Sequence, residues 1–570
     1  MKPSLPSAFS AAPKAWAALR LAALGAAWGL CSWLLLLAGL GSFGVLGPDE
    51  PRYAAIAQGM LRRHDLITPK LWGTPWLEKP VLYYWLAGAS EALTHLTDAA
   101  ARRPNALLAV LMSATLTAFL WRVHSRRAGL LAAFMSVSSV FWLSFGRAAT
   151  TDMTLTAPLA LSLMALYAWW QSHRPRWLAV AAVLLALATL AKGPVAVVLA
   201  GLILLGFAAT QGQWRRAWTS LRPLPIALFV IVAAPWYVAV SLRNPGFLRA
   251  FFWQQNLERF ATNRYEHPQA FWFYVPVLLL AVFPWTGWLG LPLAAAVRRV
   301  RGRGWRRAWQ GEDAPLKLFL GCWGLAPLIF FSLSRSKLPS YILPAIPAVV
   351  ALMAVCAAER WPRLPRWPLA ISALLTALVP AALRLTPWLV AARGLRPPLT
   401  PLLSLAGVWV PAAVTAAVLL WLVWRRRPAV VVTVMVAVMA ATAWALTRPP
   451  LSTAVDAGLS GRPLARALQA QCGASLPGGC QGVPLYAWNL KRDLLYGTQF
   501  YLGGELATWP RQDAAPAAAY IVLDRAQVPV FVARYGGAYA LAQISRLQPL
   551  HNGGTLVPWI VIRAVPLVPR

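Results

Sequence analysis

The chain has 570 residues, of which 59% are hydrophobic and only 12% are charged. Soluble domains typically carry about 25% charged residues, so this composition excludes a water-soluble globular protein. The formal net charge of +36 does not indicate nucleic-acid binding, because the arginines lie between apolar runs, as topology signals do.

The apolar runs predict a mainly α-helical, polytopic membrane protein. The first run is not a cleavable signal peptide, because it is long and lacks a small-residue cleavage site. The segment 81–96 carries Glu91 and His95 and is interpreted as an interfacial amphipathic helix. We expect thirteen spans at 16–46, 103–123, 128–146, 152–171, 176–191, 194–210, 222–242, 271–297, 315–333, 338–358, 367–388, 402–424 and 429–447.

The loops between these spans predict the orientation of the chain. With the N-terminus inside, every inner loop is basic: VHSRR, QSHRPR, QWRRAWTSLR, RRVRGRGWRRAW, ERWPRLPR and WRRRP. Basic residues mark cytoplasmic loops, so thirteen crossings place the segment after residue 448 on the far side. Carboxylates contribute little to orientation. Even so, nine of them lie in the predicted external loops or at the external membrane boundary: Asp49, Glu50, Asp65, Glu78, Glu91, Asp98, Asp152, Glu258 and Glu266. This concentration predicts a chemical site on that face.

The first external loop, 47–102, opens with GPDEPRYA. Asp49 and Glu50 follow a proline, and Arg52 and Tyr53 come one turn later, so we expect a helix that begins at Asp49 and presents this set on one side. The alternative is a surface helix in which Asp49 is only a cap.

The same loop continues with WGTPWLEKPVLYYW (72–85). Glu78 is available to a metal or an amine, and Lys79 to a phosphate. The alternative is an interfacial aromatic belt with a snorkelling lysine.

Two further motifs flank the spans that follow. FGRAATTD places Asp152 at the start of a span, where an acid is a functional candidate, although helix capping is the competing explanation. LAKGP places Lys192 before a Gly-Pro turn, as a phosphate contact or as a snorkelling side chain.

Two later external segments complete the candidate set. The loop 256–276 contains Arg264 and His267, and SRSKLPSYILP contains Arg335, Lys337 and Tyr341. A divalent metal held by Glu78 and His267 is one hypothesis, but the spacing matches no standard zinc motif. A structural histidine is the alternative.

The segment 449–570 has a different character. VPLYAW, AAYIVLDR and VPWIVIRAV predict strands and RPLARALQA predicts a helix, which together indicate a small extracytoplasmic α/β domain. Cys472 and Cys480 flank a short loop, and a disulfide there would indicate an oxidising compartment; two free thiols are the alternative. No nucleotide-binding fingerprint occurs, so we expect no nucleotide cofactor.

Together, separated external loops offer acids, lysines, arginines and tyrosines at one membrane face. Lys and Arg bind phosphate, Arg in bidentate fashion, and acids can bind a cation or an amine. We therefore expect a lipid-borne phosphate as a ligand. A transporter would place polar groups at mid-membrane, and a non-enzymatic lipid-binding scaffold would use the external charges for adhesion.

The motifs GPDEPRYA, WLEKPVLYYWL, GRAATTD, LAKGP and SRSKLPSYILP resemble the GT-C glycosyltransferases of the protein mannosyltransferase-like superfamily. Within it the chain is most similar to the bacterial lipid A aminoarabinose transferases. The resemblance implies a transmembrane GT-C domain (1–448) and a periplasmic α/β domain (449–570). It also implies an inner-membrane monomer that moves 4-amino-4-deoxy-L-arabinose from undecaprenyl phosphate to a lipid A phosphate, giving polymyxin resistance. A related GT-C enzyme with a protein or glycan acceptor stays open.

The resemblance also implies roles for the candidate residues. Asp49 and Asp152 take the places of the family's key acids, with Glu50 beside them. Arg52, Lys79, Arg264 and Tyr341 fall where donor-phosphate contacts are expected, and Glu78 and His267 are candidates for zinc or magnesium. Further expected substrate contacts are Tyr53, Lys192, Arg335 and Lys337.

Overall fold

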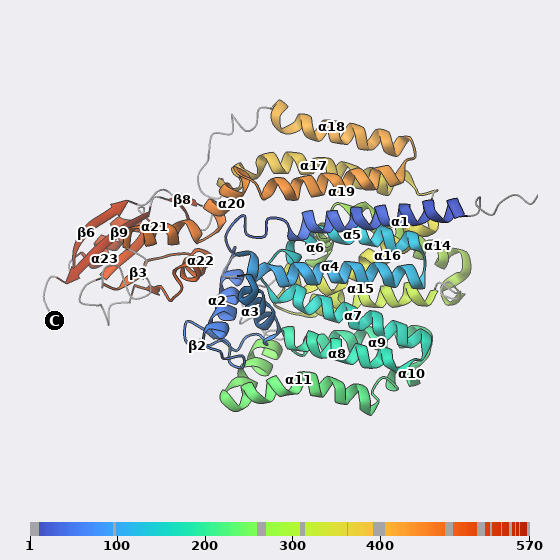
Figure 1. Ribbon diagram of the computed structural model, residues 1–570, viewed down its shortest axis with the longest axis horizontal. Helices are drawn as coiled ribbons and strands as arrows, with labels where there is room; N and C mark the ends of the chain where they lie inside the picture. Colours follow the sequence, from blue (N-terminus) through green and yellow to red (C-terminus); the bar gives the residue numbers. More distant parts are fainter. Residues whose placement is uncertain are drawn as a thin grey trace, which may run out of the picture.

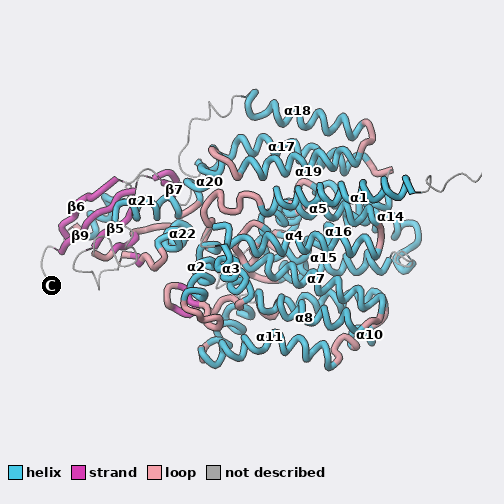
Figure 2. The backbone as a smooth tube through the Cα atoms, in the orientation of Figure 1, coloured by secondary structure: helices cyan, strands magenta, loops and turns pink. Residues whose placement is uncertain are grey.

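A computed structural model describes the chain at residues 11–94, 98–258, 269–307, 314–361, 363–391, 405–472, 483–509, 519–524, 527–536, 539–546, 550–552, 555–557 and 559–566. Long helices lie side by side in one bundle, and an α/β unit lies beyond one end of it (Figure 1). Colouring by secondary structure shows that the larger sheet is confined to that unit (Figure 2).

The bundle consists of helices and of bent helix pairs. Its elements are α1 (Ala11–Ser32) with η2 (Trp33–Leu37), α4 (Asp98–Val123), α5 (Arg126–Ser138), α6 (Val140–Gly146), α7 (Thr151–Ser172), α8 (Pro175–Lys192), α9 (Val195–Gln211), α11 (Pro223–Arg243), α13 (Tyr274–Ala281), η4 (Trp285–Leu289), α14 (Gly290–Arg307), α15 (Ala314–Leu333), η5 (Pro339–Ala345), α16 (Ile346–Arg360), α17 (Arg366–Ala391), α18 (Leu405–Trp424) and α19 (Pro428–Leu446).

In the described part of the chain, nine helices are long and apolar enough to span a membrane, or up to eleven if each of two bent pairs is one span. Two shorter apolar helices, Leu21–Leu37 and Val195–Gln211, accompany them. The chain is therefore a multi-pass integral membrane protein, as predicted. Each of the thirteen predicted segments coincides with one of these helices or bent pairs, while the number of membrane crossings stays a prediction.

The span that begins at a candidate acid is one of the two most buried spans in the described part of the chain. Within the most apolar 18-residue stretch of α7 and of the η5–α16 segment, 89% is buried inside the protein. The corresponding share is 22% in α11 and in α18. The central position of α7 places its first turn, with Asp152, inside the protein rather than against lipid.

The first external loop covers the end of the bundle that faces the α/β unit (Figure 1). It contains α2 (Asp49–Arg62), a small hairpin of β1 (Lys70–Leu71) and β2 (Thr74–Pro75), and α3 (Leu82–Thr94). The thirteen residues of α3 are too few to cross a bilayer core, in agreement with the prediction for 81–96. The short α10 (Trp214–Trp218) and the end of α14, both within basic loops, lie at the opposite end of the bundle.

After α19 the chain forms the C-terminal unit, residues 451–566. Its helices are α20 (Leu451–Leu459), α21 (Arg462–Cys472), α22 (Arg492–Leu502) and α23 (Val528–Tyr535). Its strands are β3 (Leu485–Ala487), β4 (Ala507–Thr508), β5 (Ala519–Asp524), β6 (Tyr539–Arg546), β7 (Leu550–Asn552), β8 (Thr555–Val557) and β9 (Trp559–Pro566).

A five-stranded mixed sheet of order β4-β3-β5-β9-β6 organises this unit. Strand β3 is parallel to β4 and β5, whereas β9 is antiparallel to β5 and β6. Every residue of β5 is buried. The predicted strands coincide with β3, β5 and β9 and the predicted helix with α21. Cys480 lies outside the described residues, so the predicted Cys472–Cys480 disulfide stays a prediction.

Candidate functional site

The candidate site begins at the first turn of α2. Asp49 is the first helical residue and Pro48 occupies the cap position, so Asp49 is not the cap itself. The Asp49 carboxylate pairs with the Arg52 guanidinium one turn later, and its side chain is 50% exposed. Arg52 is almost buried, and its Nε donates to the Pro48 carbonyl at 2.7 Å. The start of α2 thus presents a reachable carboxylate beside a fixed cation.

Among the described residues, three aromatic rings surround the Arg52 guanidinium. Its Cζ lies 5.3 Å from the ring centres of Trp76 and Tyr496 and 5.9 Å from that of Tyr53. Burial is the largest single influence and acts to lower the pKa of Arg52, but the charges of Asp49 and Glu78, the neighbouring Tyr53 and the hydrogen bond to Asp49 together outweigh it, so the pKa is raised. Arg52 therefore stays charged inside an aromatic cage.

A tyrosine cluster forms the inner wall behind Arg52. The rings of Tyr53, Tyr83 and Tyr84 lie 6.0 to 6.1 Å apart, and all three side chains are buried. Burial raises the pKa of Tyr53 well above its ordinary value, and the charges of Asp49 and Asp152 add to this shift. The neutral Tyr53 therefore lies within electrostatic reach of both predicted acids. The buried hydroxyl of Tyr84 has no hydrogen-bond partner in the described part of the chain.

The second acid is paired with the predicted lysine. Asp152 lies in the first turn of α7, and its Oδ1 is 2.5 Å from Nζ of Lys192, the last residue of α8. Both side chains are largely buried, at 13% and 15% exposure. The Lys192 ammonium also lies 5.4 Å from the ring centre of Tyr341 in η5. Motifs separated by about 190 residues in the sequence therefore meet at this pair.

A tight turn holds Lys192 in place. Gly193 has φ of +89°, in the region that favours glycine. A Cβ at this position would lie 2.5 Å from the Phe251 ring of η3 (Arg249–Glu258). The Gly-Pro turn predicted from the sequence therefore ends α8 at the lysine and leaves no room for a side chain.

Glu50 points away from Asp49 and into the protein. Its carboxylate accepts hydrogen bonds from Arg102 at 2.6 and 3.2 Å, from the Leu46 amide at 2.7 Å and from the Ala149 amide at 2.8 Å. Arg102 in turn donates to the carbonyls of Leu40, Phe43 and Gly44. This fully hydrogen-bonded pair ties the start of α2 to α4 and to the segment that precedes Asp152.

The remaining residues predicted to contact the substrate differ in burial and surroundings. Lys337 is buried, and its Nζ donates to the carbonyls of Ser334 at 2.6 Å and Gln269 at 3.1 Å. Arg335 is exposed and Lys79 is half-buried in the loop before α3. Arg264 lies outside the described residues. The structure therefore forms two groups of predicted residues most clearly: Asp49 with Arg52 and Tyr53, and Asp152 with Lys192 and Tyr341. The acids of both groups act electrostatically on Tyr53.

The described residues do not supply a metal-ligand set. No group of three or more His, Cys, Asp or Glu side chains that would hold a metal ion occurs among them. Glu78 lies near Arg52 and Tyr84, and His267 falls outside the described residues. The Glu78–His267 metal site therefore stays a prediction.

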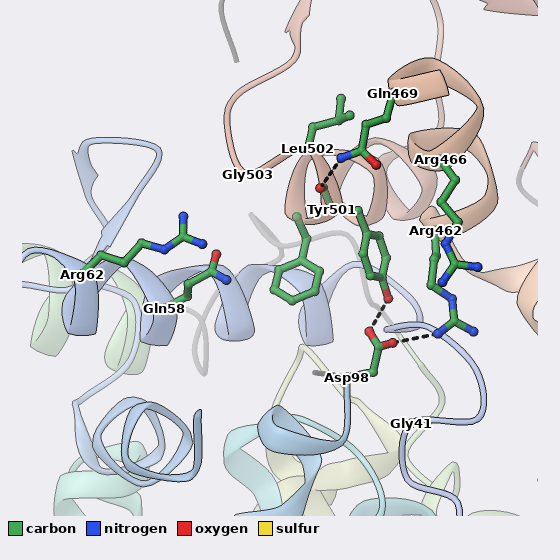
Figure 3. Close-up of a pocket in the computed structure, with 11 residues that line it drawn as sticks. Gly41, Gln58, Arg62, Asp98, Arg462, Arg466, Gln469, Tyr501, Leu502 and Gly503 are labelled. Carbon is green, nitrogen blue, oxygen red and sulfur yellow. Dashed lines mark hydrogen bonds and ion pairs between the residues drawn. The ribbon is translucent and has the colours of Figure 1, made fainter. Parts of the chain in front are cut away.

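A cavity of about 680 Å³ lies farther along α2, between the bundle and the C-terminal unit. Figure 3 shows Gln58 and Arg62 on one side and the arginines of α21 on the other. Asp98 binds Arg462 at 2.9 Å and accepts a hydrogen bond from the Tyr501 hydroxyl. This cavity does not include Asp49 or Asp152 in its lining and is separate from the acid site.

The sequence motifs did not indicate several residues of the site. Arg102 falls at the edge of a predicted span, Ser340 lies beside Asp152, and Tyr496 belongs to a segment more than 400 residues from Arg52. The aromatic run WLEKPVLYYW signalled Trp76 and Tyr84 only as members of a belt. No local pattern marks Tyr496, because its role depends on which helix of the C-terminal unit reaches α2.

The chain is similar to known proteins in both sequence and structure. Residues 78–238 match the family described as dolichyl-phosphate-mannose-protein mannosyltransferase. The chain is 33% identical over 325 residues to the undecaprenyl phosphate-alpha-4-amino-4-deoxy-L-arabinose arabinosyl transferase of Serratia proteamaculans, which covers 52% of this chain and 53% of that protein. It is 34% identical over 332 residues to the protein of the same name from Pseudomonas paraeruginosa, covering 55% and 57%.

The chain spans about half the length of the curated relatives it matches. The structural likeness is more extensive. The crystal structure of ArnT from Cupriavidus metallidurans bound to undecaprenyl phosphate has a TM-score of 0.73 at 22% identity, and the likeness covers 94% of this chain and 97% of that one. The resemblance expected from the motifs is therefore confirmed, and the chain has the GT-C fold of ArnT.

Proposed function

We propose that this protein is a glycosyltransferase that moves 4-amino-4-deoxy-L-arabinose from undecaprenyl phosphate to a lipid A phosphate at the periplasmic face of a bacterial inner membrane. The observation that carries the proposal is that two acid–cation pairs, Asp49–Arg52 and Asp152–Lys192, both have their acid within electrostatic reach of the buried Tyr53. The names of the similar transferases and the undecaprenyl phosphate bound to ArnT support the choice of donor.

The chemistry follows from the charges of the site. A phosphate acceptor is already ionised at neutral pH, so its oxygen attacks the anomeric carbon without losing a proton to the enzyme. The bond from that carbon to the undecaprenyl phosphate oxygen breaks, and the electron pair stays on the phosphate. Direct displacement inverts the anomeric centre.

The cations of the site stabilise the departing lipid phosphate. Arg52 has five N–H donors and spends two of them on Pro48 and Asp49, which leaves three for phosphate oxygens. Lys192 carries three donors and has Asp152 as its acidic partner. Asp49, whose side chain is half exposed, orients the acceptor or pairs with the ammonium of the sugar.

The modified lipid A would account for resistance to cationic antimicrobial peptides. Each transferred sugar adds an ammonium beside a lipid A phosphate and so weakens the attraction of cationic peptides such as polymyxin. The apolar helices would hold the polyprenyl tail, and the exposed side chain of Asp49 would face lipid A that approaches from the outer leaflet.

Mass spectrometry of lipid A from cells with and without this protein tests the proposal. We expect an added aminopentose mass only when the protein is present. Transfer to a protein or another glycan, with lipid A unchanged, would instead indicate a related GT-C enzyme. If the acceptor is a protein or another glycan, reconstituted protein that is given labelled donor and lipid A should transfer no label to lipid A.

A further inference from the structure

The C-terminal unit contributes an aromatic side chain to the candidate site. Tyr496, on α22, places its ring 5.3 Å from Cζ of Arg52. The other two rings around this guanidinium, Tyr53 and Trp76, belong to the first external loop. Tyr496 is therefore the ring of this cage that depends on how the C-terminal unit lies against the bundle.

A set of polar contacts holds the C-terminal unit against the approach to α2. The Tyr501 hydroxyl, also on α22, binds the Asp98 carboxylate and accepts a hydrogen bond from the Val45 amide at 2.8 Å. Asp456 accepts one from the Gly44 amide at 2.8 Å. Figure 3 shows Tyr501 and Arg462 converging on Asp98.

These contacts leave little freedom between the two parts. Leu46 and Ser460 form an isolated β-bridge. A Cβ on Gly44 would clash with the Ser460 hydroxyl oxygen. The segment 42–46, which leads directly into Asp49 and Arg52, is therefore clamped by the C-terminal unit, and α22 has a defined position over α2.

We propose that Tyr496 is a positioning residue that holds the Arg52 guanidinium in the orientation needed to receive the donor phosphate. The inference rests on the proposed function, in which Arg52 contacts that phosphate. A long side chain without such a ring samples several rotamers, whereas a ring over the guanidinium restricts it and leaves its N–H edge available. The C-terminal unit is then part of the phosphate-binding site.

The test is direct binding of undecaprenyl phosphate to the purified full-length protein in detergent, which needs neither sugar nor acceptor. We expect Tyr496→Leu to weaken binding about 2- to 30-fold, the range of a cation–π contact. Tyr496→Phe keeps the ring and should restore binding to within about twofold of wild type, since the contact uses the ring face. A merely structural role would not separate these two variants.

A matched control comes from the same unit. Tyr486 packs its ring 5.4 Å from Trp509 within the C-terminal unit, so Tyr486→Leu should lower the thermal midpoint while leaving undecaprenyl phosphate affinity unchanged. With Arg52→Ala in place, adding Tyr496→Leu should cause no further loss, because the ring acts through Arg52.

Each other outcome overturns the inference. Wild-type affinity in Tyr496→Leu would show that the ring does not position Arg52. Equal losses in Tyr496→Phe and Tyr496→Leu would assign the effect to the hydroxyl, and additive losses with Arg52→Ala would assign it to another contact. If the wild-type protein itself fails to bind undecaprenyl phosphate, the proposed function fails before the inference is reached.

Discussion

At the scale of single residues, neighbouring acids have separate tasks. Glu50 is buried under four hydrogen bonds, whereas Asp49 keeps half of its side chain exposed. A buried, fully hydrogen-bonded carboxylate has no acceptor capacity left for substrate. We therefore assign Glu50 a structural role within the proposed mechanism and reserve substrate contact for Asp49.

Replacement of Asp49 by Asn tests this assignment. We expect about 100-fold slower transfer, because the acceptor or the sugar ammonium is no longer oriented. The ratio of wild-type to mutant rates should stay constant from pH 6 to 8, measured with purified donor and lipid A. If the wild-type rate rises through an acidic pKa and the mutant rate does not, Asp49 removes a proton from substrate and the positioning role is wrong.

At the scale of elements, α2 and α3 form the platform that carries the site. Gln58 of α2 donates to Glu91 of α3 at 3.3 Å, and burial raises the pKa of Glu91 above its ordinary value. A carboxyl with a raised pKa in the folded state binds its proton more tightly there than in the unfolded chain. Its contribution to stability is therefore present at low pH and is lost as the pH rises through the folded-state pKa.

Replacement of Glu91 by Gln tests this linkage. We expect the variant to unfold at a temperature about 1 to 3 °C higher than wild type at pH 7, where the buried charge is removed. Near pH 4 the two proteins should unfold at the same temperature, because Glu91 is then protonated. Thermal unfolding in detergent at both pH values measures this, and an equal difference at both values would contradict it.

At the scale of the whole molecule, the bundle has two chemically different ends. Acids and aromatic residues lie at the end that carries α2 and α3, and α10 and the end of α14 lie with their arginines at the other. Positive-inside topology explains the basic end. The predicted thirteen crossings would place the C-terminal unit and the candidate site together outside the cytoplasm.

Cysteine labelling of spheroplasts tests this orientation. In a protein with Cys472 and Cys480 replaced by Ser, we expect Arg492→Cys on α22 to react with a membrane-impermeant maleimide in intact spheroplasts. Arg425→Cys, exposed in the loop between α18 and α19, should react only after permeabilisation. The reverse pattern would show that the number of crossings is even or the orientation inverted.

The sequence alone determined the membrane class and the helix positions, and it supplied most of the residues that make up the candidate site. These features are local, because apolar runs of span length, proline and glycine turns and the pairing of acids with arginine and tyrosine depend on residues close together in the chain. The start of α2 at Asp49 and the turn after Lys192 were therefore predictable.

Only the tertiary structure decided which of these residues are neighbours in space. Asp152 and Lys192 form a pair because α7 and α8 pack side by side. Glu50 points inward because it pairs with Arg102 on α4. Tyr496 contacts Arg52 because the C-terminal unit is hydrogen-bonded to segment 42–46. Such contacts arise from the packing of elements that are distant in the chain, and no local pattern records them.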